Sequence, residues 1–119
     1  MLTFICYPKC STCQKAQALL DRLEAQYEIR DIKTNNPTYV ELKAWFSLSG
    51  LPVKKFFNTS GILYKSLNLK EKIPSMSEEE CLELLATDGM LVKRPLLIDE
   101  HRVLVGFNAD EWESVVLAK

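Results

Sequence analysis

The sequence predicts an α/β protein with a four-stranded mixed sheet, in the order β–α–β, helical insertion, β–β–α. An opening β–α–β unit requires its two strands to pair in parallel, because a helix connects them. Near the C-terminus, the apolar runs Leu96–Ile98 and Val103–Val105 flank a turn at Glu100 and His101, which predicts an antiparallel hairpin. A sheet that combines both halves is mixed, with helices on its faces.

The first β–α–β unit occupies the N-terminal quarter of the chain. Its first strand is the apolar segment Leu2–Cys6, which Pro8 ends. Helical spacing of apolar residues begins at Ser11. The second strand covers residues 27–32, where the alternation of apolar and polar side chains is imperfect but recognisable.

The next segment carries the signals of a helix followed by irregular chain. Asn36 as N-cap and Pro37 at the first helical position predict where this helix starts, and Gly50 predicts where it ends. We expect an irregular stretch from Leu51 onward. Residues 62–67 then predict a short helix after a turn.

Two more helices have clear start signals. Ser77 with Glu80 is a capping-box pattern, and it predicts a helix that runs to about Ala86. Asn108 with Glu111 has the same spacing and predicts the last helix. The chain from about 33 to 90 is therefore predicted to be a mostly helical insertion within one domain spanning 1–119.

Composition sets the expected cellular setting. The 119 residues are 47% apolar, which suits a single core. A net charge of −1 gives no positive field for nucleic acid, so direct nucleic-acid binding is disfavoured. The first strand begins without a basic or apolar leader, and no apolar run is long enough to cross a bilayer. We therefore expect a cytoplasmic protein whose cysteines are normally reduced.

Two cysteines three residues apart are the strongest functional signal. Cys10 is predicted at the N-terminus of the first helix, where free backbone N–H groups and the helix dipole stabilise a thiolate. Cys13 lies one turn later and begins the apolar stripe that faces the core. The pattern predicts redox chemistry, with Cys10 as the exposed attacking thiol and Cys13 as the half-buried resolving thiol.

A metal site is the main alternative for these cysteines, and inert structural thiols are another. A tetrahedral zinc site would need two further ligands from Cys6, Cys81 and His101, and none of these forms a second closely spaced pair. Cys6 and Cys81 fall in apolar segments typical of small buried thiols. His101 has no catalytic partner nearby in sequence. We therefore expect no metal.

Other candidates have both a functional and a structural interpretation. Arg94 at the entry to the third strand favours an anion-binding role over a surface ion pair. Lys9 could assist ionisation of Cys10, but exposed lysines are usually only solvated. Aromatic residues in the insertion could form a partner-binding patch, although core packing is the better interpretation; they are Trp45, Phe46, Phe56 and Phe57.

Several short motifs, taken in order, resemble those of the arsenate reductase and Spx family, a branch of the thioredoxin-like fold. The match covers nearly the whole chain. It comprises Tyr7, Pro8, Lys9, Cys10, Ser11, Thr12 and Cys13 with Lys15 and Ala16, then Asp31 and Ile32, Asn58, Thr59, Ser60 and Gly61, Lys93, Arg94 and Pro95, and Val105, Gly106 and Phe107.

The resemblance implies roles for individual residues. Cys10 matches the family's nucleophile, and Arg94 matches an arginine that holds an oxyanion or neutralises the thiolate. Pro95 matches a cis proline that faces the cysteine loop. Backbone N–H groups around Ser11 and Thr12 are expected to hold developing charge.

Two features depart from the arsenate reductases of the family. Those enzymes carry further arginines in the segments that read here as Lys54, Lys55 and Phe56 and as Val105, Gly106 and Phe107. Lys54 or Lys55 could supply charge for substrate binding, but not the bidentate grip of a guanidinium. The enzymes also rely on an external thiol to resolve the adduct, whereas Cys13 can do so internally.

The resemblance thus implies two functions. The favoured one is a thiol–disulfide oxidoreductase that reduces an oxyanion or a disulfide through Cys10 and Cys13. It would need no cofactor of its own, with thioredoxin or glutathione and glutaredoxin as the external reductant. The alternative is an Spx-type redox-responsive regulator that binds the α subunit of RNA polymerase, although the chain ends at Lys119 without the charged tail of Spx proteins.

Overall fold

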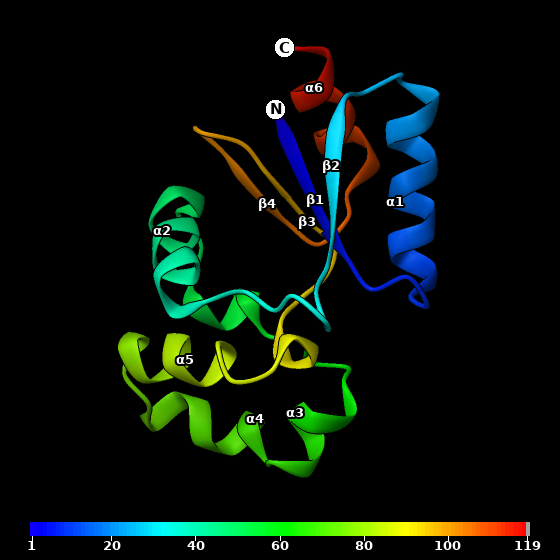
Figure 1. The fold of residues 1–119 in the computed structure, drawn as a ribbon. Helices are drawn as coiled ribbons and strands as arrows, with labels where there is room; N and C mark the ends of the chain where they lie inside the picture. Colours follow the sequence, from blue (N-terminus) through cyan, green and yellow to red (C-terminus); the bar gives the residue numbers. More distant parts are fainter. Residues whose placement is uncertain (119) are drawn as a thin grey trace.

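A four-stranded sheet forms the centre of the structure, a computed structural model that describes residues 1–118 (Figure 1). The strands are β1 (Leu2–Cys6), β2 (Tyr27–Asp31), β3 (Leu96–Ile98) and β4 (Val103–Val105), in the spatial order β2-β1-β3-β4. β1 pairs in parallel with β2 and antiparallel with β3, and β3 pairs antiparallel with β4. The predicted mixed sheet and C-terminal hairpin are confirmed.

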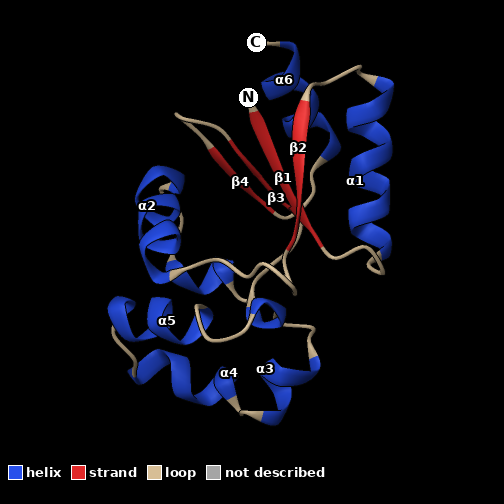
Figure 2. Cartoon of the chain, viewed as in Figure 1, coloured by secondary structure: helices blue, strands red, loops and turns tan. Residues whose placement is uncertain are grey.

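Helices connect and cover the strands, and they make up most of the chain between β2 and β3 (Figure 2). The α-helices are α1 (Ser11–Arg22), α2 (Tyr39–Ser49), α3 (Ile62–Ser66), α4 (Leu69–Lys72), α5 (Glu78–Leu85) and α6 (Ala109–Leu117). Three short 3₁₀ helices are η1 (Val53–Phe56), η2 (Ile73–Ser75) and η3 (Gly89–Leu91). Within residues 1–118, no helix is long and apolar enough to span a membrane.

Each face of the sheet has its own core because side chains alternate along a strand. Phe4 and Leu97 face α1 and α6, where Trp112 is fully buried. Ile5 and Leu96 face the opposite side, with Trp45 of α2 and the rest of the helical segment. The aromatic residues of this segment pack as predicted: Trp45, Phe56 and Phe57 are buried and Phe46 is partly buried against them.

The N-cap of α2 lies two residues later than predicted. Thr38, not Asn36, is the N-cap, because Thr38 and Glu41 form a complete capping box that satisfies two backbone N–H groups. The Asn36 side chain instead donates to the carbonyl of Ala86 at 2.9 Å. Gly50 ends the helix with a φ of 66°, as expected.

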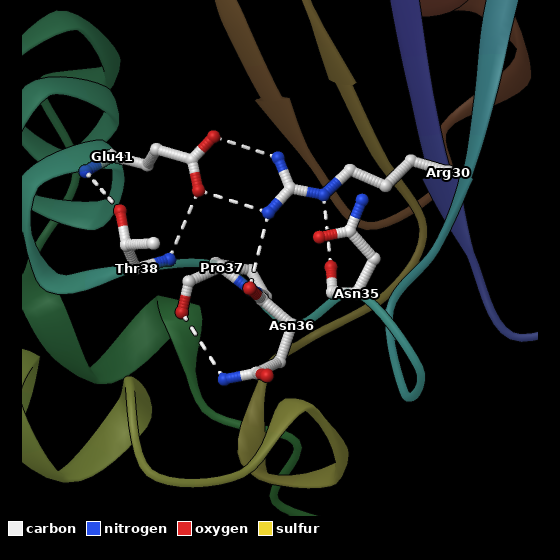
Figure 3. Close-up of polar contacts among 6 residues, drawn as sticks. All are labelled: Arg30, Asn35, Asn36, Pro37, Thr38 and Glu41. Atoms are coloured by element: carbon white, nitrogen blue, oxygen red, sulfur yellow. Dashed lines mark hydrogen bonds and ion pairs between the residues drawn. The ribbon is translucent and has the colours of Figure 1, made fainter.

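Arg30 of β2 fixes the start of α2 from the sheet side (Figure 3). Its guanidinium makes a bidentate contact with Glu41, at 2.7 and 2.9 Å, and donates to the backbone carbonyls of Asn35 and Asn36. The chain between β2 and α2 is thereby tied to the sheet.

The unpredicted elements are the short ones. The stretch expected to be irregular after Leu51 contains η1, and α4 with η2 follows α3. Figure 1 shows α3, α4 and α5 gathered beyond the end of the sheet where β1 leads into α1. This arrangement places the helical segment next to the first turn of α1.

Candidate functional site

Cys10 is the N-cap of α1, the position that the sequence predicts. The loop after β1 turns tightly, and the Cys10 amide donates to the carbonyl of Tyr7 at 2.9 Å. The Cys10 carbonyl accepts from Gln14 at 3.0 Å, the first hydrogen bond of the helix. The thiol is therefore held where the backbone N–H groups of the first turn converge.

The surroundings of Cys10 favour its thiolate. Partial burial by itself would raise the pKa of this thiol. Hydrogen bonds from the backbone amide and thiol of Cys13, the amide of Thr12 and the guanidinium of Arg94 outweigh burial and lower the pKa below its ordinary value. Cys10 is therefore the thiol of the site that ionises most readily.

Cys13 has the opposite character. Its side chain is buried, and the amide of Tyr7 donates to its Sγ at 3.4 Å. Burial, together with the proximity of the Cys10 charge, raises the pKa of Cys13 to about 12. Cys13 thus stays protonated while Cys10 is an anion, and its thiol hydrogen stabilises that anion.

The other two cysteines are not activated. Burial is the main cause that raises the pKa of both Cys6 and Cys81. All four cysteines are free, and only Cys10 has a lowered pKa. Within the described chain, no three His, Cys, Asp or Glu side chains gather in a way that could hold a metal ion.

Arg94 reaches the cysteine loop from the entry to β3. The bond between Arg94 and Pro95 is cis, as predicted. The Arg94 guanidinium stacks on the ring of Tyr7, with 5.2 Å between Cζ and the ring centroid. Its Nη1 is buried without a hydrogen-bond partner in the described residues, so a donor remains available beside Cys10.

A pocket of about 620 Å³ opens beside Cys10. Its polar lining includes Cys10, Thr12, Lys93 and Arg94, and its apolar lining comes from the helical segment and the loop after β4. The remaining lining residues are Asn58, Ser60, Gly61, Ile62, Leu63, Met90 and Phe107. The pocket therefore combines a nucleophile, two cations and an apolar rim.

The structure does not bring every sequence candidate into this pocket. Ser11 is exposed in the first turn of α1, and Pro95 is buried next to Arg94. Lys54 and Lys55 line a different hollow, of about 740 Å³, which contacts the Cys10 pocket only through the shared residue Lys93.

Two residues of the site received no role from the sequence. Tyr7 contacts Cys10, Cys13 and Arg94, and Lys93 supplies the second cation of the pocket. The sequence signal that could have identified Tyr7 and Lys93 is their place within the motifs at residues 7–13 and 93–95. The exposed His101 lies in the hairpin turn, where its amide donates to Asp99.

Comparisons with known proteins agree with this geometry. The ArsC family profile matches residues 6–115. The uncharacterized protein YusI of Bacillus subtilis (strain 168) is 54% identical over 113 residues, covering 95% of this chain and 96% of YusI. The global transcriptional regulator Spx of Enterococcus faecalis is 32% identical over 111 residues, covering 93% of this chain and 83% of Spx.

A solved structure is similar over nearly the same length. It is the crystal structure of a protein from Bacteroides fragilis described as related to the ArsC family, with a TM-score of 0.94 and 58% sequence identity. The match covers 96% of each chain.

Proposed function

This chain belongs to the ArsC family, and we propose that it is a thiol–disulfide oxidoreductase that reduces a disulfide or an oxyanion through Cys10 and Cys13. One observation carries the proposal. Two thiols lie one helical turn apart, and the pKa of Cys10 is lowered while that of Cys13 is raised. This asymmetry supports Cys10 as the attacking thiol and Cys13 as the resolving thiol.

In the first step, the Cys10 thiolate attacks one sulfur of the substrate disulfide. A mixed disulfide forms on Cys10, and the other half of the substrate leaves as a thiolate that takes up a proton from water. With an oxyanion, the thiolate forms a bond to the central atom, and one oxygen of the oxyanion takes up protons from the solvent and leaves as water. Arg94 and the amides of Thr12 and Cys13 hold the negative charge in either case.

Formation of the adduct prepares the second step. Burial raises the pKa of Cys13, and the Cys10 anion raises it further. Once Cys10 is in the adduct its charge is gone, so Cys13 gives up its proton more easily. Cys13 then attacks Sγ of Cys10 and releases the reduced substrate. An electron pair passes from the dithiol to the substrate, and a Cys10–Cys13 disulfide remains.

The cycle closes with an external reductant. A reducing cytoplasm would supply thioredoxin, or glutathione with glutaredoxin, to restore the two thiols. The burial of Cys13 supports Cys10 as the sulfur that such a reductant attacks, because only an accessible sulfur of a disulfide can be attacked by an external thiol.

The test uses a chromogenic aryl disulfide. The wild-type protein should release one equivalent of aryl thiol when Cys10 attacks the aryl disulfide and a second when Cys13 resolves the adduct. Cys13→Ser should release only the first and keep the aryl adduct, visible by intact mass. Cys81→Ser is the matched control, because Cys81 is a buried thiol far along the chain. Full release by Cys10→Ser would contradict the proposal.

A second function has its own support. A 32% identical relative is called a global transcriptional regulator, and its match extends over 93% of this chain. In that role the Cys10–Cys13 disulfide would change local packing. A partner such as the α subunit of RNA polymerase would then bind one redox state in preference to the other.

A pull-down from lysate separates the two functions. Disulfide-linked partners trapped by Cys13→Ser support the oxidoreductase. Recovery of RNA polymerase α subunit by the wild-type protein, without a disulfide link and dependent on the redox state of Cys10, supports the regulator.

A further inference from the structure

Strand β4 leaves one edge of the sheet without a partner. It is the last strand in the order β2-β1-β3-β4 (Figure 1). The amide of Asp99 donates to Arg102 at 3.0 Å, and the amide of Gly106 donates to Pro95 at 2.9 Å. Because hydrogen-bonded pairs alternate in an antiparallel ladder, Leu104 is the residue between them that bonds to β3.

The backbone groups of Val103 and Val105 therefore point away from β3. Within residues 1–118, these N–H and C=O groups make no hydrogen bond to another part of the chain. Together they form a row of donors and acceptors that another extended chain could pair with.

The hollow of about 740 Å³ lies along this edge. Val103, Leu104 and Val105 all line it, although side chains of consecutive strand residues point to opposite faces of the sheet. A hollow that touches all three therefore lies against the edge of the strand. Its other walls are the segment after α2, with Leu51, Pro52 and the buried Phe57, and Glu111 of α6.

The hollow has an excess of positive charge. Lys54, Lys55 and Lys93 line it, and Glu111 is the one acidic residue among the lining residues. Lys54 and Lys55 are exposed and free to meet a ligand. Two copies of this chain joined edge to edge would bring these lysines together, so the charge favours an acidic partner over a second copy.

We propose that an extended acidic segment of another polypeptide binds along β4 as a fifth strand of the sheet. Its backbone pairs with Val103 and Val105, and its acidic side chains lie beside Lys54 and Lys55. Lys93 lines both hollows, so the bound segment lies next to the Cys10 pocket. This binding does not depend on the oxidoreductase activity.

The experiment uses a fluorescein-labelled peptide of alternating glutamate and valine, with binding followed by fluorescence anisotropy. Lys54→Glu combined with Lys55→Glu should weaken binding about tenfold, because attraction becomes repulsion at two positions. Lys70→Glu with Lys72→Glu is the control, since it makes the same charge change on α4, outside the hollow. Thermal melts establish that both variants are folded.

Two further arms test the backbone pairing. A peptide with alternate amides N-methylated should lose binding, and the amides of Val103 and Val105 should become protected from hydrogen exchange when the unmodified peptide binds. Equal binding of a lysine–valine peptide, or of the N-methylated peptide, would overturn the proposal. So would sedimentation that shows this chain occupying its own β4 edge as a dimer.

Discussion

The guanidinium of Arg94 lies over the ring of Tyr7, with 5.2 Å between Cζ and the ring centroid. The backbone of Tyr7 also contacts both cysteines of the site: its carbonyl accepts from the amide of Cys10, and its amide donates to Sγ of Cys13. Tyr7 thus contacts Arg94, Cys10 and Cys13. The ring supports Arg94, whereas the backbone supports the cysteines.

This division predicts the effect of removing the ring. Tyr7→Ala keeps the backbone contacts but leaves Arg94 without its stacking surface, so Arg94 should donate less well to Cys10. We expect the pKa of Cys10 to rise toward its ordinary value, because the hydrogen bond from Arg94 helps to lower it. The ultraviolet absorbance of the thiolate against pH measures it. Tyr7→Phe retains the ring and should leave the pKa unchanged; equal shifts in both variants would contradict the role of the ring.

The parts of the site that follow from local pattern were predictable. Pro8 ends the first strand and the apolar spacing starts with Cys13, so Cys10 could be placed at the helix N-terminus from sequence alone. The position of Lys54 and Lys55 could not be predicted in this way. It depends on how η1 packs against α5 and lines the hollow beside β4, through contacts between segments far apart in the chain.

The same contrast explains the start of α2. Asn36 with Pro37 predicts one start for this helix, and the structure uses another, at Thr38 with Glu41. Tertiary contacts decide between them, because Ala86 takes the Asn36 side chain and Arg30 holds Glu41. Neither partner is visible in the local sequence.

The contact between Arg30 and Glu41 makes stability depend on pH. Hydrogen bonds from Arg30 lower the pKa of Glu41 from 4.5 to about 2. A lowered pKa means that the contribution is complete above the unfolded value and is lost as the pH falls from 4.5 to about 2. Because 34% of the Glu41 side chain is exposed, solvent screening weakens its attraction to Arg30. Glu41→Gln should therefore lower the free energy of unfolding by about 1–2 kcal/mol at neutral pH.

Urea denaturation at several pH values measures this contribution. The difference between the wild-type protein and Glu41→Gln should shrink as the pH falls through the window above. Glu79→Gln is the control, because Glu79 pairs with Lys43 on the surface and should change stability little. A difference that stays constant down to about pH 2 would exclude the ionised Glu41 as its source.

Gly89 permits a close approach of two backbone segments. A Cβ at this position would overlap the carbonyl of Ile32, directly after β2. Backbone atoms cannot yield as a flexible side chain can, so Gly89→Ala should lower the free energy of unfolding by more than about 2 kcal/mol. At Gly50 the φ is 66° and no atom lies within 4 Å of an added Cβ, so alanine meets only backbone strain. Gly50→Ala should therefore lower the free energy of unfolding by about 1–2 kcal/mol. Similar urea midpoints for the two variants would mean that the segments at Ile32 and Gly89 separate easily.

The cations of the Cys10 pocket predict its preference between substrates. Lys93 and Arg94 are the basic residues among its lining, and only Arg94 can grip an oxyanion with two parallel hydrogen bonds. Each charge-assisted hydrogen bond is worth about 1.5–3 kcal/mol. A pocket that lacks two further arginines should therefore reduce arsenate roughly two to four orders of magnitude more slowly than a family enzyme that has them. When a small disulfide is attacked, one half of it leaves as a thiolate and needs no bidentate hydrogen bonds from an arginine. Disulfide reduction should therefore persist.

The assay is NADPH oxidation coupled through thioredoxin or glutaredoxin, with arsenate or a small disulfide as substrate. Cys10→Ser should abolish both reactions, because it removes the nucleophile. Arg94→Lys keeps the charge but not the planar fork, so it should slow any residual arsenate reduction more than disulfide reduction. Rapid arsenate turnover by the wild-type protein, lost in Cys10→Ser and in Arg94→Ala, would show that one arginine is enough in this pocket.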